Sequence, residues 1–192
     1  MKGCRSLSDE EVVEIIGVLK SKRDVMLFTM GIKSGLRISE LLSLTIKDVM
    51  EHGKVGTKVT VKKCNTKGKQ ESKTLPLTES VRTAIQVYLD EIKVYDLNDP
   101  LFKGGNKKEG PYKAISRIQA HRILKDAFNK LKLTGNLATH SCRKTYAKNI
   151  HKALGNDLLK TQKAMCHKSL SSTVQYLDVS QEEVEDAILG LG

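Results

Sequence analysis

The chain has 192 residues, 39% of them hydrophobic, which is enough for one ordinary domain with its own core. Its 33 lysines and arginines against 22 aspartates and glutamates give a net charge of +11, which favours a polyanionic partner such as nucleic acid. The sequence contains neither an apolar stretch of 18 residues nor a charged-then-apolar leader. We therefore expect neither a membrane span nor secretion.

Four scattered cysteines include no CxxC pair, so a reducing compartment fits better than a disulfide framework. A zinc site built from His140, Cys142, Cys166 and His167 has poor chelate spacing, because zinc ligands usually come in pairs two to four residues apart. We expect no metal, and we expect Cys142 to face the core.

Three helices are expected at the start of the chain. Ser8–Glu11 form a capping box before an apolar series that reaches Leu19. A second helix covers the apolar residues Val25–Ile32 and is broken by Gly35. A third, short helix starts at Arg37.

Arg37 stands at the start of that third helix, where a guanidinium can present its fork of N–H groups to two phosphate oxygens. The alternative is a surface salt bridge with Glu40, three residues further on. Glu40 is therefore expected to support Arg37 and not to do chemistry itself.

A basic hairpin is expected next. Apolar residues alternate with Lys and Thr over residues 54–63, Asn65–Lys69 is a turn signal, and Ser72–Leu77 can return as a second strand. Five lysines lie near the tip and are expected to contact solvent or DNA phosphates, with at most one of them catalytic: Lys62, Lys63, Lys67, Lys69 and Lys73.

The middle of the chain predicts a helix that is capped by Thr78–Glu79 and runs through Ile92, a polar loop from Tyr95 to Pro111, and a helix over Ser116–Leu131 with Ile118 in its buried stripe. The whole chain is thus expected to be mainly α with a small antiparallel β-sheet, an α+β fold.

The C-terminal third carries the residues most typical of chemistry. His140 and Arg143 are three residues apart and share one face of a helix start, where an anion is favoured. His167 precedes Tyr176 by nine residues, and a short helix opening at Ser172 carries that tyrosine. Arginine, histidine and tyrosine without an acidic cage indicate phosphate chemistry that needs no metal.

A last helix is predicted after the capping box Ser180–Glu183. The segment 180–192 is acidic and apolar, and it lacks basic residues. It is therefore expected to pack on a neighbouring subunit and not on DNA.

These motifs together resemble the tyrosine recombinase (phage integrase) family. Ser34–Leu42 looks like the first-arginine box of that family, His140-x-x-Arg143 like the second, and Cys166–Tyr176 like the third. The basic hairpin lies where the family keeps its catalytic lysine. The likeness covers the chain from about residue 8 to residue 188, and it implies the catalytic-domain fold of a tyrosine recombinase.

Three departures qualify the resemblance. Cys166 stands where the family usually has glycine, and the hairpin is one residue longer than usual, so Lys69 remains an alternative to Lys67. The family's N-terminal DNA-clamp (core-binding) domain is not found in residues 1–192. We therefore expect a single catalytic domain, either a fragment or a natural single-domain member.

The resemblance implies that DNA strands are cleaved and rejoined through a covalent 3′-phosphotyrosine. Tyr176 would be the nucleophile. Arg37 and Arg143 would hold the non-bridging oxygens, where negative charge concentrates during attack and where preorganised donors lower the barrier most.

The resemblance also assigns the proton transfers. His140 would accept the proton of the phenol, His167 would hydrogen-bond a phosphate oxygen, and Lys67 would protonate the departing 5′-oxygen. No nucleotide or metal cofactor is expected, because the phosphotyrosine conserves the energy of the broken bond.

The implied partners are double-stranded DNA recombination sites and other copies of the chain. We expect a tetramer on paired sites and a monomer or weak oligomer without DNA, in the nucleoid of a prokaryotic cytoplasm and encoded by a phage or another mobile element. Six lysines are the expected DNA contacts: Lys62, Lys63, Lys69, Lys73, Lys144 and Lys168.

Two alternatives remain open at this point. A type IB topoisomerase-like DNA relaxase shares the catalytic constellation and acts as a monomer. A non-catalytic DNA-binding remnant of a mobile element would bind without a covalent adduct.

Overall fold

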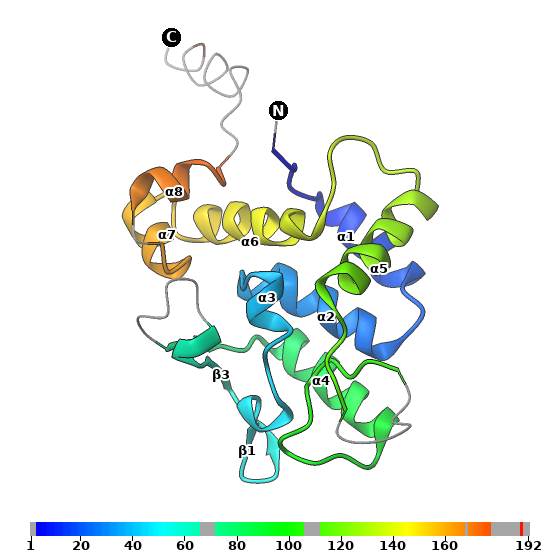
Figure 1. Cartoon of the computed structure of the whole chain (residues 1–192). Helices are drawn as coiled ribbons and strands as arrows, with labels where there is room; N and C mark the ends of the chain where they lie inside the picture. Colours follow the sequence, from blue (N-terminus) through cyan, green and yellow to red (C-terminus); the bar gives the residue numbers. More distant parts are fainter. Residues whose placement is uncertain (1–2, 66–71, 106–111, 168, 178–188, 190–192) are drawn as a thin grey trace. The chain divides into compact units, whose positions relative to one another are not determined.

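A computed structural model of the chain describes residues 3–65, 72–105, 112–167, 169–177 and 189. These residues fall into two compact units, Met1–Tyr146 and Ala147–Gly192. In the first unit, helices are joined by two short hairpins (Figure 1), and the second unit is helical. The expected fold class, mainly α with a minor antiparallel β component, is confirmed.

Helix α2 (Lys22–Ser34) is the central element of the first unit. Ser21 caps its start by accepting a hydrogen bond from the Asp24 N–H, and Gly35 ends it in the left-handed region at φ 62°. The helix packs against α4 (Glu79–Ile92), as Figure 1 shows. It is buried on nearly every side, which explains why its apolar residues show no clean helical stripe.

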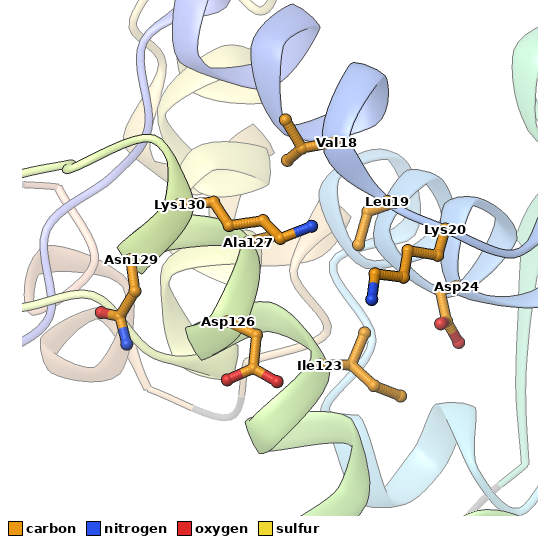
Figure 2. Close-up of a pocket in the computed structure, with 9 residues that line it drawn as sticks. All are labelled: Val18, Leu19, Lys20, Asp24, Ile123, Asp126, Ala127, Asn129 and Lys130. Atoms are coloured by element: carbon orange, nitrogen blue, oxygen red, sulfur yellow. The ribbon is translucent and has the colours of Figure 1, made fainter.

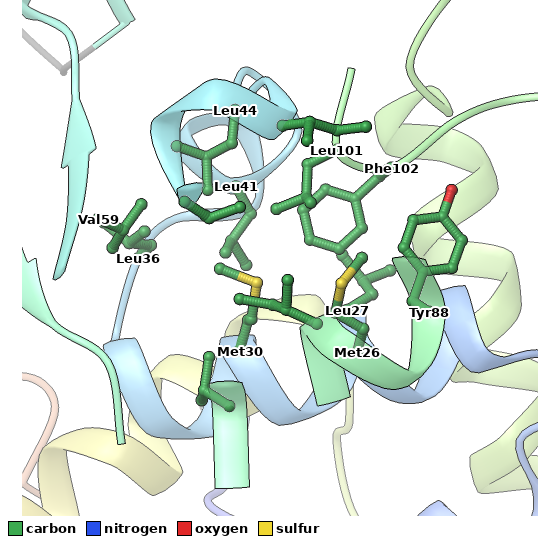
Figure 3. Packing of buried hydrophobic residues seen from close by; sticks show 14 of the residues in the cluster. Met26, Leu27, Met30, Leu36, Leu41, Leu44, Val59, Tyr88, Leu101 and Phe102 are labelled. Carbon is green, nitrogen blue, oxygen red and sulfur yellow. The ribbon is translucent and has the colours of Figure 1, made fainter. Parts of the chain in front are cut away.

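One core cluster lies between α2, α4 and the segments around them. Met26 and Met30 of α2 belong to it together with Tyr88 of α4 and with Phe102 (Figure 3). Met26, Met30 and Phe102 are completely buried. This cluster fixes the position of the segment that follows α2, where the first arginine box lies.

A second cluster joins α2 to α1 (Asp9–Val18) and α5 (Arg117–Lys130). Phe28 of α2 and Phe128 of α5 are buried in it together with Ile15 of α1. The expected capping box of α1 is confirmed, since Ser8 accepts from the Glu11 N–H and Glu11 from the Ser8 N–H. The buried stripe predicted for α5 is confirmed for Leu124, Ala127 and Phe128. The prediction is wrong for Ile118, which lies in the first turn and is 65% exposed.

The described residues contain four short strands, whereas the sequence predicted one hairpin of two strands. The predicted strand over 54–63 is two strands: β2 (Lys54–Val55) pairs with β1 (Met50–Glu51), and β3 (Lys58–Val61) pairs with β4 (Lys73–Pro76). The part of the chain that the structure describes therefore contains two small antiparallel sheets, where one was expected.

The extra hairpin was missed because its turn is unusual. His52 and Gly53 both have positive φ, 49° and 76°, which is the geometry of a tight two-residue hairpin turn. Such turns strongly prefer Asn-Gly or Asp-Gly, so His52-Gly53 carried only the glycine as a signal.

Helix α6 (Thr139–Ala153) contributes its first part to the first unit and its remainder to the second. The second unit also contains α7 (Leu158–Ala164) and α8 (Leu170–Val174). The cap of α8 is Ser169, so this helix starts before the predicted Ser172, and Tyr176 comes just after its end. The predicted helix that follows, with its subunit contact in residues 180–192, lies outside the described residues except for Leu189.

None of the helices within the described stretches has the length and apolar character needed to cross a bilayer.

Candidate active site

Three predicted site residues of the first unit line one pocket. Arg37 comes from the start of α3 (Ile38–Leu41), and His140 and Arg143 come from the first turn of α6. The pocket measures about 170 Å³. Its lining consists of Leu36, Arg37, Ile38, Ser39, Arg117, Thr139, His140 and Arg143. Three arginines and a histidine around one small hollow form a site suited to an anion.

Arg143 is held by the end of helix α2. Its side chain is buried, and Nη1 donates a hydrogen bond to the carbonyl oxygen of Gly35. Gly35 is in the left-handed conformation, and a Cβ at this position would overlap the ring of Tyr146. The glycine thus gives the chain the turn that presents its carbonyl to Arg143, two residues before Arg37.

Arg37 is held by Glu40. The Glu40 side chain is 1% exposed, and its Oε2 accepts a hydrogen bond from the Arg37 backbone N–H at 2.8 Å. Its Oε1 accepts from Arg37 Nη1 at 3.3 Å and from Lys73 Nζ at 2.8 Å. The expected supporting contact of Glu40 is present, although it is a buried one, and Lys73 is a second partner that was not anticipated.

The electrostatics of the pocket keep His140 neutral. The residue is exposed, but partial removal of its ring from water lowers the pKa of His140, and the cations Arg143, Arg37 and Lys144 lower it further. A neutral imidazole at physiological pH can accept a proton, which an imidazolium cannot.

Cys142 lies between His140 and Arg143 and faces the core, as predicted. It is 5% exposed, and a Cβ at Gly31 of α2 would come within 3.2 Å of the Cys142 Cβ. Burial raises the pKa of this thiol to about 12, so it is an inert packing residue. Among the described residues, no cluster of three or more His, Cys, Asp or Glu side chains is arranged to hold a metal ion.

The second unit brings His167 and Tyr176 together. Their ring centroids are 5.1 Å apart, with the ring planes at 40°. His167 Nδ1 lies 2.9 Å from Thr173 Oγ1, and Thr173 is completely buried. The turn around Cys166 and the short helix α8 therefore hold the histidine and the tyrosine next to each other.

Cys166 itself has φ 50°, a left-handed conformation that glycine adopts without strain. This explains physically why glycine is usual at this position in the family that the sequence resembles. The cysteine side chain is exposed, so the departure is accommodated without a clash in the core.

The predicted lysines have different surroundings. Lys62 is about half exposed and lies 3.5 Å from Asp48, whereas Lys73 is 16% exposed and Lys144 is buried. The other predicted lysines are not placed: Lys67, Lys69 and Lys168 lie outside the described residues, and only the backbone of Lys63 is described.

The sequence did not predict three features of the site, although Lys73 itself was an expected DNA contact. Thr173 contacts His167, Lys73 contacts Glu40, and Arg117 lines the arginine pocket. Only Arg117 had a usable signal, because the capping box at Ser116 places it in the first turn of a helix. The other two contacts join residues by tertiary structure or by a turn that periodicity does not predict.

A larger hollow of about 520 Å³ lies elsewhere in the first unit (Figure 2). The end of α1, the start of α2 and one side of α5 surround it, with apolar Leu19 and Ile123 beside charged Lys20 and Asp126. None of the predicted site residues lines it.

Known proteins resemble the chain along nearly all of its length. Residues 5–183 match the phage integrase family. The chain is 34% identical over 183 residues to a probable integrase/recombinase, YoeC, of Bacillus subtilis, which covers 95% of this chain and 92% of that protein.

Two solved structures share the fold. A crystal structure of XerA recombinase has a TM-score of 0.77 at 21% identity and covers 96% of this chain and 62% of its own. A post-cleavage complex of the XerH site-specific recombinase with its palindromic difH substrate has a TM-score of 0.74 at 22% identity and covers 95% of this chain. The chain spans only 51% of that XerH chain.

A cationic pocket with His140, a histidine beside Tyr176 and a match over residues 5–183 agree with one another. The chain belongs to the phage integrase family, the tyrosine recombinases that cleave and rejoin DNA.

Proposed function

We propose that this chain is a site-specific DNA recombinase whose Tyr176 attacks a DNA phosphodiester. The phenolic oxygen forms a bond to phosphorus, the bond from phosphorus to the 5′-oxygen breaks, and the 3′ side of the strand stays on the tyrosine. A 5′-hydroxyl then attacks the phosphotyrosine and releases the phenol. The observation that carries this proposal is the pocket of about 170 Å³ that Arg37, His140 and Arg143 line.

The arginines stabilise the charge that develops on the phosphate. Attack gives a five-coordinate phosphorus with concentrated charge on its non-bridging oxygens, and fixed guanidinium donors are most effective there. Arg143 is held by the carbonyl of Gly35 and Arg37 by Glu40, so neither has to be ordered when DNA binds. Arg117 at the same pocket adds a third positive charge.

The two histidines have different roles in this mechanism. His140, whose pKa is lowered, accepts the proton of Tyr176. His167 hydrogen-bonds a phosphate oxygen, and its contact with Thr173 fixes the rotation of its ring.

The leaving 5′-oxygen needs a proton of its own. Lys67 supplies it, with Lys69 as the alternative donor. The same proton returns when the 5′-hydroxyl attacks, so the cycle of cleavage and rejoining is balanced without a nucleotide or another co-reactant.

We infer that the natural partners are double-stranded recombination sites in the nucleoid, bound by a tetramer on paired sites. The net charge of +11 and the exposed Lys62 near the hairpin tip support DNA binding. The XerH complex with its difH substrate is a DNA-bound relative of the same fold. The relatives named above are recombinases and integrases, which favours recombination over relaxation or binding alone.

A nicked duplex tests the proposal. When the nick releases the short strand after cleavage, rejoining is prevented and the covalent complex accumulates. Duplexes drawn from DNA that flanks the native gene are incubated with the wild-type chain and with Tyr176→Phe, then run on a denaturing gel. We expect a shifted band with the wild type alone. DNA retention in a native gel without any covalent band would instead support a binding module.

A further inference from the structure

Lys73 differs from an ordinary DNA-contacting lysine. It was expected to lie on the basic surface, but its side chain is only 16% exposed, and its ammonium group lies 2.8 Å from the Glu40 carboxylate. Arg37 Nη1 lies 3.3 Å from the same oxygen. Lys73 is thus the closer of the two cations to Glu40.

Lys73 lies at the end of the β3–β4 ladder, so its ion pair with Glu40 joins this ladder to the start of α3. Lys73 is the first residue of β4 and pairs with Val61 of β3, which is the last described pair of the ladder before residues 66–71. Lys67 and Lys69, the candidate general acids, belong to that segment by sequence. The ion pair therefore fixes the described end of the β3–β4 ladder, where the chain resumes after residues 66–71, to the helix start that carries Arg37.

Charge balance also favours a role for the contact. Glu40 is buried, and burial alone would raise its pKa, but hydrogen bonds from Lys73 and from the Arg37 backbone N–H hold the pKa of Glu40 below its ordinary value. The carboxylate thus has one negative charge between two cations. With Lys73 present, Arg37 is not the only cation that neutralises Glu40, and its guanidinium keeps net positive charge for a phosphate.

We propose that Lys73 is a positioning residue of the recombinase. Through Glu40 it keeps the Arg37 guanidinium directed to the phosphate, and it anchors the described end of the β3–β4 ladder next to which the candidate general acids lie in sequence. This inference rests on the proposed function. It also reassigns Lys73, because a positioning residue acts on the rate of cleavage and a DNA contact acts on affinity.

The test compares Lys73→Met, Lys73→Arg and a matched control, Lys58→Met. Lys58 lies on the same hairpin but is exposed on β3. Single-turnover cleavage of the nicked duplex is measured at saturating DNA, and affinity is measured separately by titration over a range of salt concentrations. Misplacement of a catalytic group by about 1 Å can cost roughly 100-fold in rate.

We expect Lys73→Met to lower the cleavage rate at saturation by roughly 10- to 100-fold while its affinity stays within about twofold of the wild type. Lys73→Arg restores most of the rate, and Lys58→Met cleaves as the wild type does. In a Glu40→Gln background Lys73→Met has little further effect, because its route through the carboxylate is already lost. A full rate at saturation, together with weaker binding and a salt slope reduced by about 0.9, would identify a phosphate contact and overturn the proposal.

A readout independent of activity separates this inference from the proposed function. The loss of melting temperature on Lys73→Met is compared in the wild-type and Glu40→Gln backgrounds. We expect the loss to be clearly smaller in the second, since the partner charge is gone. Equal losses in the two backgrounds would overturn the ion pair. A wild-type chain that forms no covalent adduct would refute the recombinase and leave the ion pair to be judged by melting alone.

Discussion

The centroid of the His167 imidazole lies 5.1 Å from the centroid of the Tyr176 ring, which is a normal separation for two rings in contact. The histidine is tied by its Nδ1 to the buried hydroxyl of Thr173 at 2.9 Å. Thr173 therefore sets the orientation of the His167 imidazole, which in turn contacts the ring of Tyr176. Thr173 itself takes no part in the chemistry.

Removal of the Thr173 hydroxyl should slow cleavage without unfolding the protein. Thr173→Val keeps the shape of the side chain but loses the hydrogen bond to His167, whose net contribution is about 1 kcal/mol. We expect the single-turnover cleavage rate to fall roughly fivefold to tenfold. Thr173→Ser keeps the hydroxyl and should restore the rate, which is measured on the same nicked duplex.

Ser172→Ala serves as the control, because the Ser172 hydroxyl contacts Ser169 and not His167. Equal rates for the valine and serine variants of Thr173 would show that the hydrogen bond has no part in catalysis.

The low pKa of His140 predicts how the protein responds to pH. Partial desolvation and the cations Arg143, Arg37 and Lys144 disfavour the imidazolium, so the folded state binds this proton less tightly than the unfolded state. The His140 ring, followed by NMR, should titrate below pH 6.5, and the contribution of this group should reduce stability as pH falls below 6.5. Arg37→Gln removes one cation and should move the titration upward. A midpoint at or above 6.5 in the wild type would contradict the account.

Gly35 is predicted to be irreplaceable even by alanine. Its φ of 62° is strained for any other residue, and a Cβ would overlap the Tyr146 ring. We expect Gly35→Ala to reduce the free energy of unfolding by about 3 kcal/mol, measured by urea denaturation. Arg143, which donates to the Gly35 carbonyl, should lose its position, so cleavage should fall as well.

Gly17 in α1 is the matched control, since a Cβ there meets open space. Gly17→Ala should be neutral or stabilising by up to about 1 kcal/mol. If the two alanine variants were equally stable, the close approach at Gly35 would be refuted.

Replacement of Cys166 by glycine should stabilise the protein, whereas replacement of Gly35 by alanine should destabilise it. Because its φ is 50°, a left-handed conformation, glycine should relieve strain of about 1 kcal/mol or more, partly offset by the greater freedom of glycine in the unfolded chain. Cys166→Gly is therefore expected to stabilise the protein by about 0.5 kcal/mol in urea unfolding. Cys166→Ala removes the same thiol but keeps the strain, so it should bring no gain. An equal gain from both variants would mean that the thiol, and not the backbone, is the source.

Local sequence signals predicted much of this fold. The capping box at Ser8, the glycine at the end of α2 and the spacing of His140 and Arg143 each act within a few residues, and the structure has all of them. The individual site residues could be named from the sequence for the same reason, since each motif is short, and their roles stay predictions.

The predictions that were wrong concern side chains whose surroundings depend on contacts between residues far apart in the sequence. Periodicity placed Ile118 in a buried stripe, but its side chain is 65% exposed, whereas Ala120 two residues later is fully buried. Nothing local indicates that Lys73 crosses to Glu40, 33 residues away, because a lysine that pairs with a buried carboxylate looks in sequence like any surface lysine. Tertiary packing decides such positions.

The most direct measurement of the central claim is to identify the residue that carries the DNA. The covalent complex is digested with nuclease and trypsin, and the modified peptide is sequenced by mass spectrometry. Trypsin cleaves after Lys168 and releases Tyr176 on a peptide that begins at Ser169, since residues 169–192 contain no further lysine or arginine. We expect a nucleotide linked through its 3′-phosphate to Tyr176. A nucleotide on a serine of the same peptide, on another tyrosine such as Tyr146, or linked through a 5′-phosphate would contradict it.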